Sequence, residues 1–423
     1  MLIEFSVTNF RSFRDKQTLS MVAAGSDKEH LETHTLDSGI KNFDRLLASA
    51  VVYGPNAAGK TNLLRALQFM QSHVTNSAVV GPISQVAYTP FLFDTESRNK
   101  PSSFEVTFIA NSVRYEYGFS IDNIRVHHEW LIEYRTKNPS RLFDRTYDNK
   151  HDKYDWVFSA YLKGNKFVWR DATRPNALFL STAIQLNNSQ LLQVYWWFQK
   201  RLIVIAGASM LNAVMTLKML EDPTNKERIL PFVRVADLGV DDVKVSREIL
   251  TGNTAFLSGS LAPPLVYQDS PTSPPILAHV TFSHVSKGLK EPVALPFEDE
   301  SNGTQVLFRN AGAWLNVFLN GEVLVIDEID TSLHTLLVAY FINRFHSSHT
   351  NQNNAQLVFS THNTSLLSQD LFRRDQIWFV EKSENSSKLY PLSDFSPRKD
   401  EMLERWYMRG RYGALPILGV SDV

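Results

Sequence analysis

Residues 54–61 carry the pattern Gly54-x-x-x-x-Gly59-Lys60-Thr61, a spacing typical of loops that cradle phosphate groups. The two glycines let the backbone turn its amide N–H groups toward a phosphate. We expect Lys60 to reach the β- and γ-phosphates of a nucleotide and the Thr61 hydroxyl to ligate Mg²⁺. The spacing therefore predicts a site for ATP and Mg²⁺, in which Asn56, Gly59 and Asn62 are further cofactor-binding candidates.

A strand and a helix must flank this loop if it is to bind phosphate. Residues 48–53 form a short, β-branched apolar run that is typical of a buried strand. After the loop, Leu63, Leu67 and Met70 recur at helical spacing without an intervening glycine or proline. The loop is thus predicted to lie at the amino end of a helix, whose positive end attracts phosphate.

Two carboxylates follow a second apolar run, residues 322–326. At the end of this predicted strand, Asp327 would hold Mg²⁺ or a water molecule on it. Its neighbour Glu328 would orient and deprotonate the attacking water. A buried strand capped by two solvated acids is common on its own, so the assignment depends on the pairing with Lys60.

A histidine and a helix start complete the set of candidates. Residues 356–360 predict a strand that ends at Thr361 and His362, so the imidazole would face the crevice outside the strand ends, where α/β sheets bind ligands. Upstream, Ser301 and Gly303 precede an apolar helix predicted over 306–319. Such a start makes both an N-cap and an anion site, and an ordinary capping box is the alternative interpretation.

The order of these motifs resembles the ABC-type ATPase heads of the SMC, RecF and OLD (overcoming-lysogenisation-defect) families. This resemblance implies an α/β fold, an ABC-type P-loop ATPase head with an antiparallel β subdomain and a helical insertion. It also implies that two heads sandwich ATP, each completing the site of the other. By position, the residues that match its motifs are Ser301, Gly303 and Gln305 of the signature motif, Asp330 of the D-loop, the switch histidine His362, and Arg11 in the N-terminal turn that contacts nucleotide.

Residues 373–380 and 410–416 look like the stand-alone RloA-type branch found in bacterial anti-phage defence. That likeness implies a homo-dimer or higher homo-oligomer that controls an effector protein, a TOPRIM-type or other nuclease. Basic and aromatic groups near the C-terminus would either form a solvated face with ordinary packing or dock this effector: Arg373, Arg374, Trp406, Tyr407, Arg409, Arg411 and Tyr412. The sequence departs from its relatives in having no long coiled-coil arm and no TOPRIM-like acidic cluster after His362. Gln85 is the nearest candidate for the Q-loop glutamine.

We divide the chain into an N-terminal lobe (1–135), a mainly helical or mixed insertion (136–294) and a C-terminal lobe (295–423). Alternation of apolar and polar residues predicts strands in the N-terminal lobe, over 2–10, 17–23, 104–109, 113–119 and 126–134. Within the insertion, 176–236 is predicted helical and the proline-rich stretch 262–275 is predicted to be a loop. The aromatic cluster 195–198 is expected to be core rather than a partner surface.

Composition narrows the class of protein. A formal net charge of −1 over 423 residues argues against wholesale coating of nucleic acid, although indirect contact stays open. The absence of cysteine excludes disulfides and thiol catalysis. Without an apparent signal peptide or membrane span, we expect a cytoplasmic protein. The alternatives to an ATP-driven switch are an ATP-gated scaffold or inhibitor with little turnover, a RecF-like DNA-binding ATPase and a hexameric AAA+ remodeller; direct nuclease activity is the least favoured.

Overall fold

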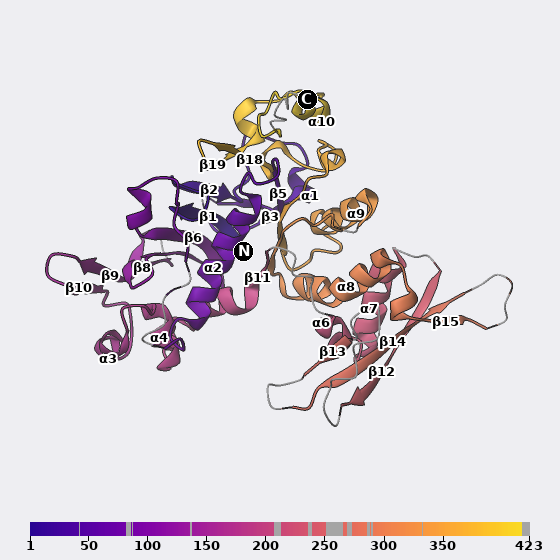
Figure 1. Ribbon diagram of the computed structural model, residues 1–423, viewed down its shortest axis with the longest axis horizontal. Coiled ribbons are helices and arrows are strands. Elements are labelled where there is room, and N and C mark those ends of the chain that lie inside the picture. The colour runs from indigo at the N-terminus through magenta and orange to yellow at the C-terminus, as the bar shows by residue number, and fades with distance from the viewer. Residues whose placement is uncertain are drawn as a thin grey trace, which may run out of the picture. The chain divides into compact units, whose positions relative to one another are not determined.

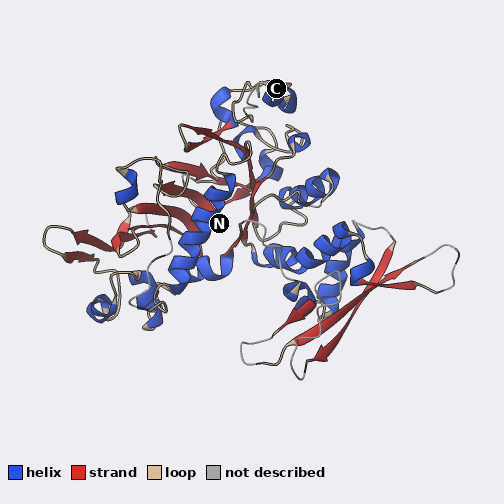
Figure 2. Ribbon diagram, viewed as in Figure 1, coloured by secondary structure: helices blue, strands red, loops and turns tan. Residues whose placement is uncertain are grey.

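The computed structural model describes residues 1–41, 43–81, 86, 88–135, 138–206, 213–235, 239–250, 265–268, 273–285, 288, 291–331 and 333–416. The chain forms two compact units, each of which is considered by itself (Figures 1 and 2). The first unit comprises Met1–Ala208, Asn320–Ile329 and Phe341–Val423, and the second comprises Ser209–Leu319 and Asp330–Tyr340.

A mainly parallel sheet carries the phosphate-binding loop in the first unit. Its described strands lie in the order β11-β16-β17-β5-β18-β19, and only the last pair is antiparallel. The central strand β5 is buried at every residue, as expected for a β-branched run covered on both faces. The bounds are β5 Ser49–Tyr53, β11 Leu202–Ile205, β16 Val323–Ile326, β17 Gln356–Ser360, β18 Ile377–Ser383 and β19 Ser386–Pro391.

The second sheet of this unit is antiparallel, in the order β10-β9-β8-β7-β6-β1-β2. The strands predicted over 104–109 and 113–119 are confirmed as β6 and β7, which pair along their length as a hairpin around a turn in which Asn111 and Ser112 have positive φ. The sheet continues past residue 135 into β9 and β10. The bounds are β1 Leu2–Thr8, β2 Gln17–Ser20, β6 Ser102–Ala110, β7 Val113–Ile121, β8 Val126–Tyr134, β9 Ser140–Asp148 and β10 Lys153–Phe158, with a separate pair β3 Thr35–Asp37 and β4 Arg45–Leu47.

Helix α2 (Lys60–Asn76) packs against strands of both sheets, with contacts to β1, β6 and β11. It buries Leu63, Leu67 and Met70, as the sequence predicted. In the aromatic cluster, Trp197 is buried and stacks on Phe108 with ring centroids 4.2 Å apart, which confirms a core role for this part of it. The other helices of the unit are α1 Leu31–His34, α3 Lys166–Ala172, α4 Phe179–Gln185, α5 Leu192–Trp196, a π-helical turn Trp197–Arg201, and α10 Leu403–Met408.

The second unit combines a small antiparallel sheet with helices. A Cβ on Gly312 would meet the Thr216 backbone nitrogen at 2.4 Å, so glycine permits the close approach of two helices there. The strands are β12 Val240–Ile249, β13 Leu265–Tyr267, β14 Ile276–His284 and β15 Val293–Pro296. The helices are α6 Val214–Met219, α7 Pro223–Arg234, most of α8 Asn302–Asn320, and the first half of α9 Thr335–His346.

The α/β fold class is confirmed, whereas two local predictions are wrong. The stretch 176–236, expected to be helical, contains strand β11, a run of four apolar β-formers that is too short to separate from helix by periodicity. The stretch 262–275, expected to be a loop, contains strand β13, while residues 262–264 and 269–272 lie outside the described residues. Within the described chain, no helix is long and apolar enough to cross a membrane.

Candidate functional site

The phosphate-binding loop runs from the end of β5 at Tyr53 to the start of α2 at Lys60. Gly54 and Gly59 have φ of 155° and 121°, backbone conformations that residues with a side chain rarely adopt. A Cβ on Gly54 would meet the Val380 carbonyl oxygen at 2.2 Å, and one on Gly59 would meet Ser387 Oγ at 2.4 Å. Both glycines of the motif are therefore required by the fold around the loop.

The lysine of the motif is folded against its own loop. Lys60 is buried, and its Nζ donates to the carbonyl oxygens of Gly54 at 2.7 Å and Pro55 at 3.2 Å. The tip of the loop, Asn56 and Ala57, is exposed. Thr61 follows as the second residue of α2 and is half-buried. The Lys60 ammonium group is therefore held by carbonyl groups of the loop whose tip is exposed.

The N-terminal turn clamps the far end of the loop. Asn62 Nδ2 donates to Ser12 Oγ at 2.9 Å, and the Ser387 N–H donates to the Ser12 carbonyl oxygen at 2.7 Å. Ser387 Oγ in turn donates to the Ala58 carbonyl oxygen. The two sheets are thus joined through the loop by Ser12, in the turn between β1 and β2, and by Ser387 in β19. Asn62 is part of this clamp through its hydrogen bond to Ser12.

Arg11 lines a surface hollow that is separate from the cavity beside the tip of the phosphate-binding loop. Its φ is 52° and its N–H donates to the Thr89 carbonyl oxygen at 2.8 Å. Its side chain lines a hollow of about 510 Å³ along α2 together with Arg65. Burial, with the Arg65 charge as a second cause, lowers the pKa of the Arg11 guanidinium. An anion at this position would relieve the repulsion between the two guanidinium groups.

Asp327 is held by a residue of the neighbouring strand. Ser360, the last residue of β17, donates its hydroxyl proton to Asp327 Oδ1 at 2.5 Å. Strands β16 and β17 pair in parallel, so their carboxyl ends meet at one edge of the sheet. Sequence reasoning missed Ser360. The available signal was a hydroxyl at the strand end directly before Thr361 and His362.

Glu328 has a strained backbone and an accessible side chain. Its φ is 50°, a left-handed conformation that is uncommon outside glycine and clusters at functional sites. The Glu328 N–H donates to Ser360 Oγ at 2.8 Å, which compensates part of the strain. Its carboxylate oxygen Oε1 lies 3.6 Å from His362 Nε2, and the two side chains are 52% and 37% exposed. A carboxylate and an imidazole therefore meet where water can reach them.

The second unit carries the remaining candidates. Ser301 caps α8, because its Oγ accepts the Thr304 N–H at 3.2 Å. Gln305 Nε2 donates to the Glu300 carbonyl oxygen at 3.0 Å. A Cβ on Gly303 would meet Ser301 Oγ at 3.8 Å, so the surface at this helix start is open. Asp330 carries a buried Oδ1 that has no hydrogen-bond partner within the described part of the chain. Gln85 lies outside the described residues.

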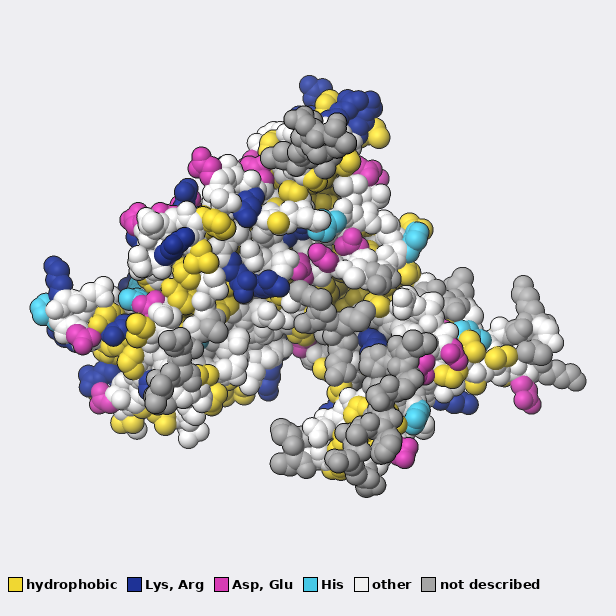
Figure 3. All heavy atoms as spheres, viewed as in Figure 1, with side chains coloured by type: hydrophobic (Ala, Val, Ile, Leu, Met, Phe, Trp, Pro, Cys, Tyr) yellow, Lys and Arg dark blue, Asp and Glu magenta, His cyan; other side chains and the backbone are white. Residues whose placement is uncertain are grey.

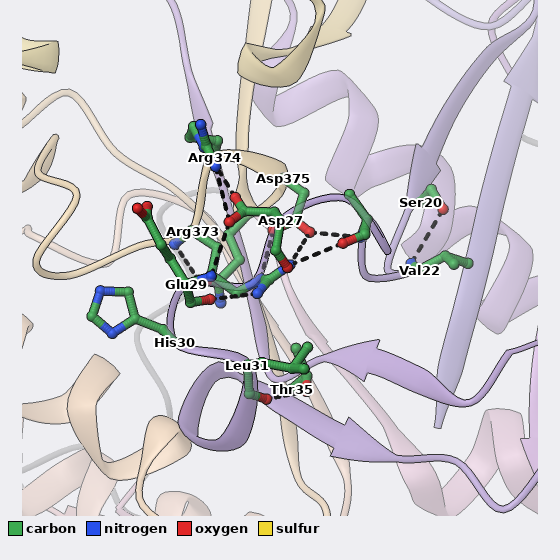
Figure 4. Close-up of polar contacts among 12 residues, drawn as sticks. Ser20, Val22, Asp27, Glu29, His30, Leu31, Thr35, Arg373, Arg374 and Asp375 are labelled. Carbon is green, nitrogen blue, oxygen red and sulfur yellow. Dashed lines mark hydrogen bonds and ion pairs between the residues drawn. The ribbon is translucent and has the colours of Figure 1, made fainter. Parts of the chain in front are cut away.

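Three of the seven basic and aromatic groups near the C-terminus are buried, whereas Arg409 and Arg411 are exposed. Arg373 is 1% exposed and donates to Asp375 Oδ2 at 2.7 Å, and Arg374 Nε donates to Asp27 Oδ2 at 3.0 Å (Figure 4). Tyr407 and Tyr412 are buried as well. On the face drawn in Figure 3, basic and acidic side chains are interspersed, in keeping with the formal net charge of −1. A packing role is thus supported for the buried members of this set, while Arg409 and Arg411 lie at the surface.

The residues present fit a magnesium nucleotide. The loop leaves no room for a Cβ at either glycine, and it brings backbone amides and one ammonium group to the start of a helix of 17 residues. Magnesium prefers oxygen ligands and is commonly held by one or two protein groups together with substrate phosphates. Thr61 and Asp327 supply a hydroxyl and a carboxylate of this kind. A cavity of about 770 Å³, large enough for a nucleotide, opens beside residues 53–58.

Residues 49–189 and 228–368 match the family described as "AAA domain, putative AbiEii toxin, Type IV TA system". The chain belongs to this family. The match spans more than half of the chain and includes the loop, the Asp327 strand and His362. This AAA-domain protein is thus a P-loop ATPase by family.

Solved structures overlap with this AAA-domain protein only loosely. They include an SMC head bound to the C-terminal winged-helix domain of ScpA, at a TM-score of 0.42 and 13% identity over 92% of this chain and 97% of that chain. The SMC head domain from Thermotoga maritima matches at a TM-score of 0.39 and 11% identity, over 92% of this chain and 98% of that chain. An SMC head from Pyrococcus furiosus, bound to the C-terminal domain of ScpA, matches at a TM-score of 0.38 and 10% identity, over 92% of this chain and 96% of that chain. Among curated proteins, none matches.

Proposed function

We propose that this protein binds Mg²⁺-ATP and hydrolyses it at the loop beside β5. The observation that carries the proposal is the alignment of two strand ends, where Ser360 holds Asp327 at 2.5 Å and also accepts the Glu328 N–H at 2.8 Å. Lys60 and the loop amides bind the β- and γ-phosphates. Thr61 and Asp327 hold the metal, which neutralises phosphate charge when it is bound.

In this proposal Glu328 is the general base. Its carboxylate is accessible to water and lies 3.6 Å from His362 Nε2, so the imidazole is placed to orient the carboxylate. Asn56, at the exposed tip of the loop, contacts the phosphate end of the nucleotide. Arg11 adds positive charge from the N-terminal turn next to the loop's clamp.

We further propose that two copies complete each other's sites, as in the ATPase heads that this chain resembles. Ser301 is exposed at the start of a helix of 19 residues, and Gly303 leaves the backbone there uncovered. Such a helix start attracts anions. Ser301, Gly303 and Gln305 would meet the γ-phosphate held by the partner, and Asp330 would contact the paired site. Bound ATP then holds the two copies together by contacting both of them.

The output we propose is control of a separate effector, a TOPRIM-type or other nuclease or a toxin, in cytoplasmic anti-phage defence. The family description, "AAA domain, putative AbiEii toxin, Type IV TA system", supports a role in a toxin–antitoxin type of defence system. Residues 373–380 and 410–416, with their RloA-type pattern, point to the same class of system.

The experiment uses the purified chain and the product of the neighbouring gene. We expect the chain alone to hydrolyse ATP and to leave plasmid, linear DNA and tRNA intact. Addition of the neighbouring protein should produce nucleic-acid damage in vitro, and Lys60→Ala should remove the defence phenotype in cells. Cleavage by the chain alone that is insensitive to Lys60→Ala and Glu328→Gln would contradict the proposal.

A second candidate function is an ATP-gated scaffold or inhibitor that turns over little. The observation that favours it is the close approach of His362 Nε2 to Glu328 Oε1 at 3.6 Å, because an imidazole at this distance competes with water for the position beside the carboxylate. A turnover rate below one per minute, together with tight ATP binding and ATP-dependent pairing of chains, would favour the scaffold. A RecF-like role would instead require ATP-dependent binding to DNA.

A further inference from the structure

The C-terminal segment forms the second of the walls of the cavity beside the phosphate-binding loop. Polar residues from two other segments line this cavity as well: Thr361, His362, Thr364, Glu381 and Lys382. Residues 53–58 form the first wall. The second wall is mostly apolar or without a side chain, and it is lined by Met408, Gly410, Gly413, Ala414, Leu415 and Pro416. A segment more than 350 residues from the loop in sequence thus forms a large part of the same cavity of about 770 Å³.

Buried rings and hydrogen bonds hold this wall in place. Tyr407 Oη donates to the Ala414 carbonyl oxygen at 2.8 Å, and Tyr390 Oη donates to the Tyr412 carbonyl oxygen at 2.9 Å. The Phe379 ring, on β18, stacks on those of Tyr407 and Tyr412 with centroids 5.4 and 5.8 Å apart. The wall is therefore anchored to the strand next to β5.

The turn itself is built for a close approach. Gly413 has φ of 66°, and a Cβ there would meet Tyr390 Oη at 2.6 Å and Glu381 Oε2 at 2.7 Å. Ala414 is also left-handed, with φ of 52°. Strained turns of this kind persist where the surroundings over-determine them. The wall is thus pre-formed, and a ligand would meet it without having to order it first.

Strand order indicates which end of a nucleotide faces this wall. Asp327 and Glu328 follow β16, which lies two strands from β5 on one side, and β18 is the neighbour of β5 on the other. The terminal phosphate must point toward Asp327 and Glu328. The nucleoside end then extends in the opposite direction, over β18, where the C-terminal wall is anchored.

We infer that residues 408–416 form the surface against which the base of the bound nucleotide packs. The inference rests on the proposed function and names the part of the site that contacts the base. An apolar wall suits the flat face of a base and supplies affinity by contact rather than by hydrogen-bond readout. Loss of contact area should therefore weaken nucleotide binding without altering the phosphate-binding loop.

The test compares two exposed methionines at the two ends of α10. Met408 is 59% exposed and lines the cavity, whereas Met402 is 64% exposed and does not. We expect Met408→Ser combined with Leu415→Ser to weaken Mg²⁺-ATP binding roughly tenfold in calorimetric titration, from the lost apolar contact. The matched control, Met402→Ser, should bind ATP like the wild type.

Photolabelling gives a second readout that does not depend on substitution. Irradiation with 8-azido-ATP, which carries the reactive group on the base, should attach label to tryptic peptides covering residues 406–416, and excess ATP should suppress it. Labelling confined to other peptides, or unchanged affinity in the double variant, would overturn the inference while leaving ATP binding intact. If the wild type neither binds ATP nor is labelled, the proposed function itself fails.

Discussion

Ser360 Oγ donates to Asp327 Oδ1 at 2.5 Å, across two parallel strands whose residues are 33 positions apart in sequence. The same hydroxyl oxygen accepts the Glu328 N–H at 2.8 Å. One side chain therefore fixes the carboxylate proposed to hold the metal and the backbone of the proposed general base. Substitution of groups that orient metal ligands in this way typically lowers metal affinity or activity by roughly 10- to 100-fold.

Replacement of Ser360 by alanine should lower the rate of ATP hydrolysis by roughly 10- to 100-fold. Affinity for ATP should change little, since the loop and Lys60 are untouched. Steady-state hydrolysis and calorimetric binding, measured on the same preparation, separate the two quantities.

Ser77→Ala is the matched control for that variant, because Ser77 is also buried and hydrogen-bonded but lies at the end of α2. Both variants should lose stability, and only Ser360→Ala should lose hydrolysis. Equal hydrolysis by the two variants would remove the role assigned to Ser360.

Replacement of Lys60 by alanine should weaken Mg²⁺-ATP binding by roughly 100-fold, because charge-assisted bonds to phosphate are lost. Its Nζ now donates to Gly54 and Pro55 oxygens of the loop, so the substitution also frees two carbonyl groups. Thermal unfolding with and without ATP measures the effect: the wild type should be stabilised by ATP and the variant should not. Equal stabilisation of both proteins would contradict the role of Lys60.

Trapped ATP should pair two chains if the Ser301 helix start completes the partner's site. We expect Glu328→Gln with Mg²⁺-ATP to elute as a dimer, and Glu328→Gln combined with Ser301→Arg to elute as a monomer. Arginine at this exposed position adds bulk, and loss of the cap that Ser301 makes to the Thr304 N–H should cost about 1 kcal/mol of stability within its own chain. If both proteins show the same oligomer and retain the same amount of nucleotide, the shared-site proposal is wrong.

Stability should fall in mild acid because neutral histidines are buried in the first unit. Burial lowers the pKa of His34 and of His73 to about 4, and that of His346 well below its ordinary value; the His34 and His346 rings stack at 3.8 Å. Their stabilising effect is complete above pH 6.5, the value in the unfolded chain, and is lost as pH falls toward the folded values. Each of these buried histidines should lower the free energy of unfolding by about 1.4 kcal/mol at pH 5.5.

Urea unfolding at pH 7.5 and pH 5.5 measures that loss. The free energy of unfolding should differ less between pH 7.5 and pH 5.5 in the His34→Gln variant than in the wild type, by the contribution of one histidine. This holds whatever the substitution does to stability at pH 7.5. A free energy of unfolding that is unchanged between the two pH values in the wild type would show that these rings are not kept neutral by the fold.

The sequence predicted the parts of the site whose function depends on local chemistry. The loop from Gly54 to Thr61, the strand before Asp327 and the cap at Ser301 each follow from residues adjacent in the chain. The β6–β7 hairpin is local in the same sense. These patterns are visible because their physical cause lies within a few residues.

The missed features depend on contacts between distant segments. Ser360 gains its role only when β16 and β17 pair, and the clamp of Ser12 on Asn62 needs the N-terminal turn to meet the loop. Strand β11 was taken for helix because four apolar residues fit either period. The sequence leaves two interpretations open for the C-terminal groups, a solvated face with ordinary packing or a docking face, and the structure buries Arg373 and bonds it to Asp375. Burial of this kind has no local sequence signal.

Hydrolysis by the wild type and by Glu328→Gln, with ATP binding measured in parallel, tests the central claim most directly. Glutamine keeps the shape of the side chain but cannot accept a proton. We expect unchanged affinity for Mg²⁺-ATP and a hydrolysis rate lowered by roughly 100-fold or more. Equal rates for the two proteins would contradict the claim that this carboxylate activates water at an ATP site.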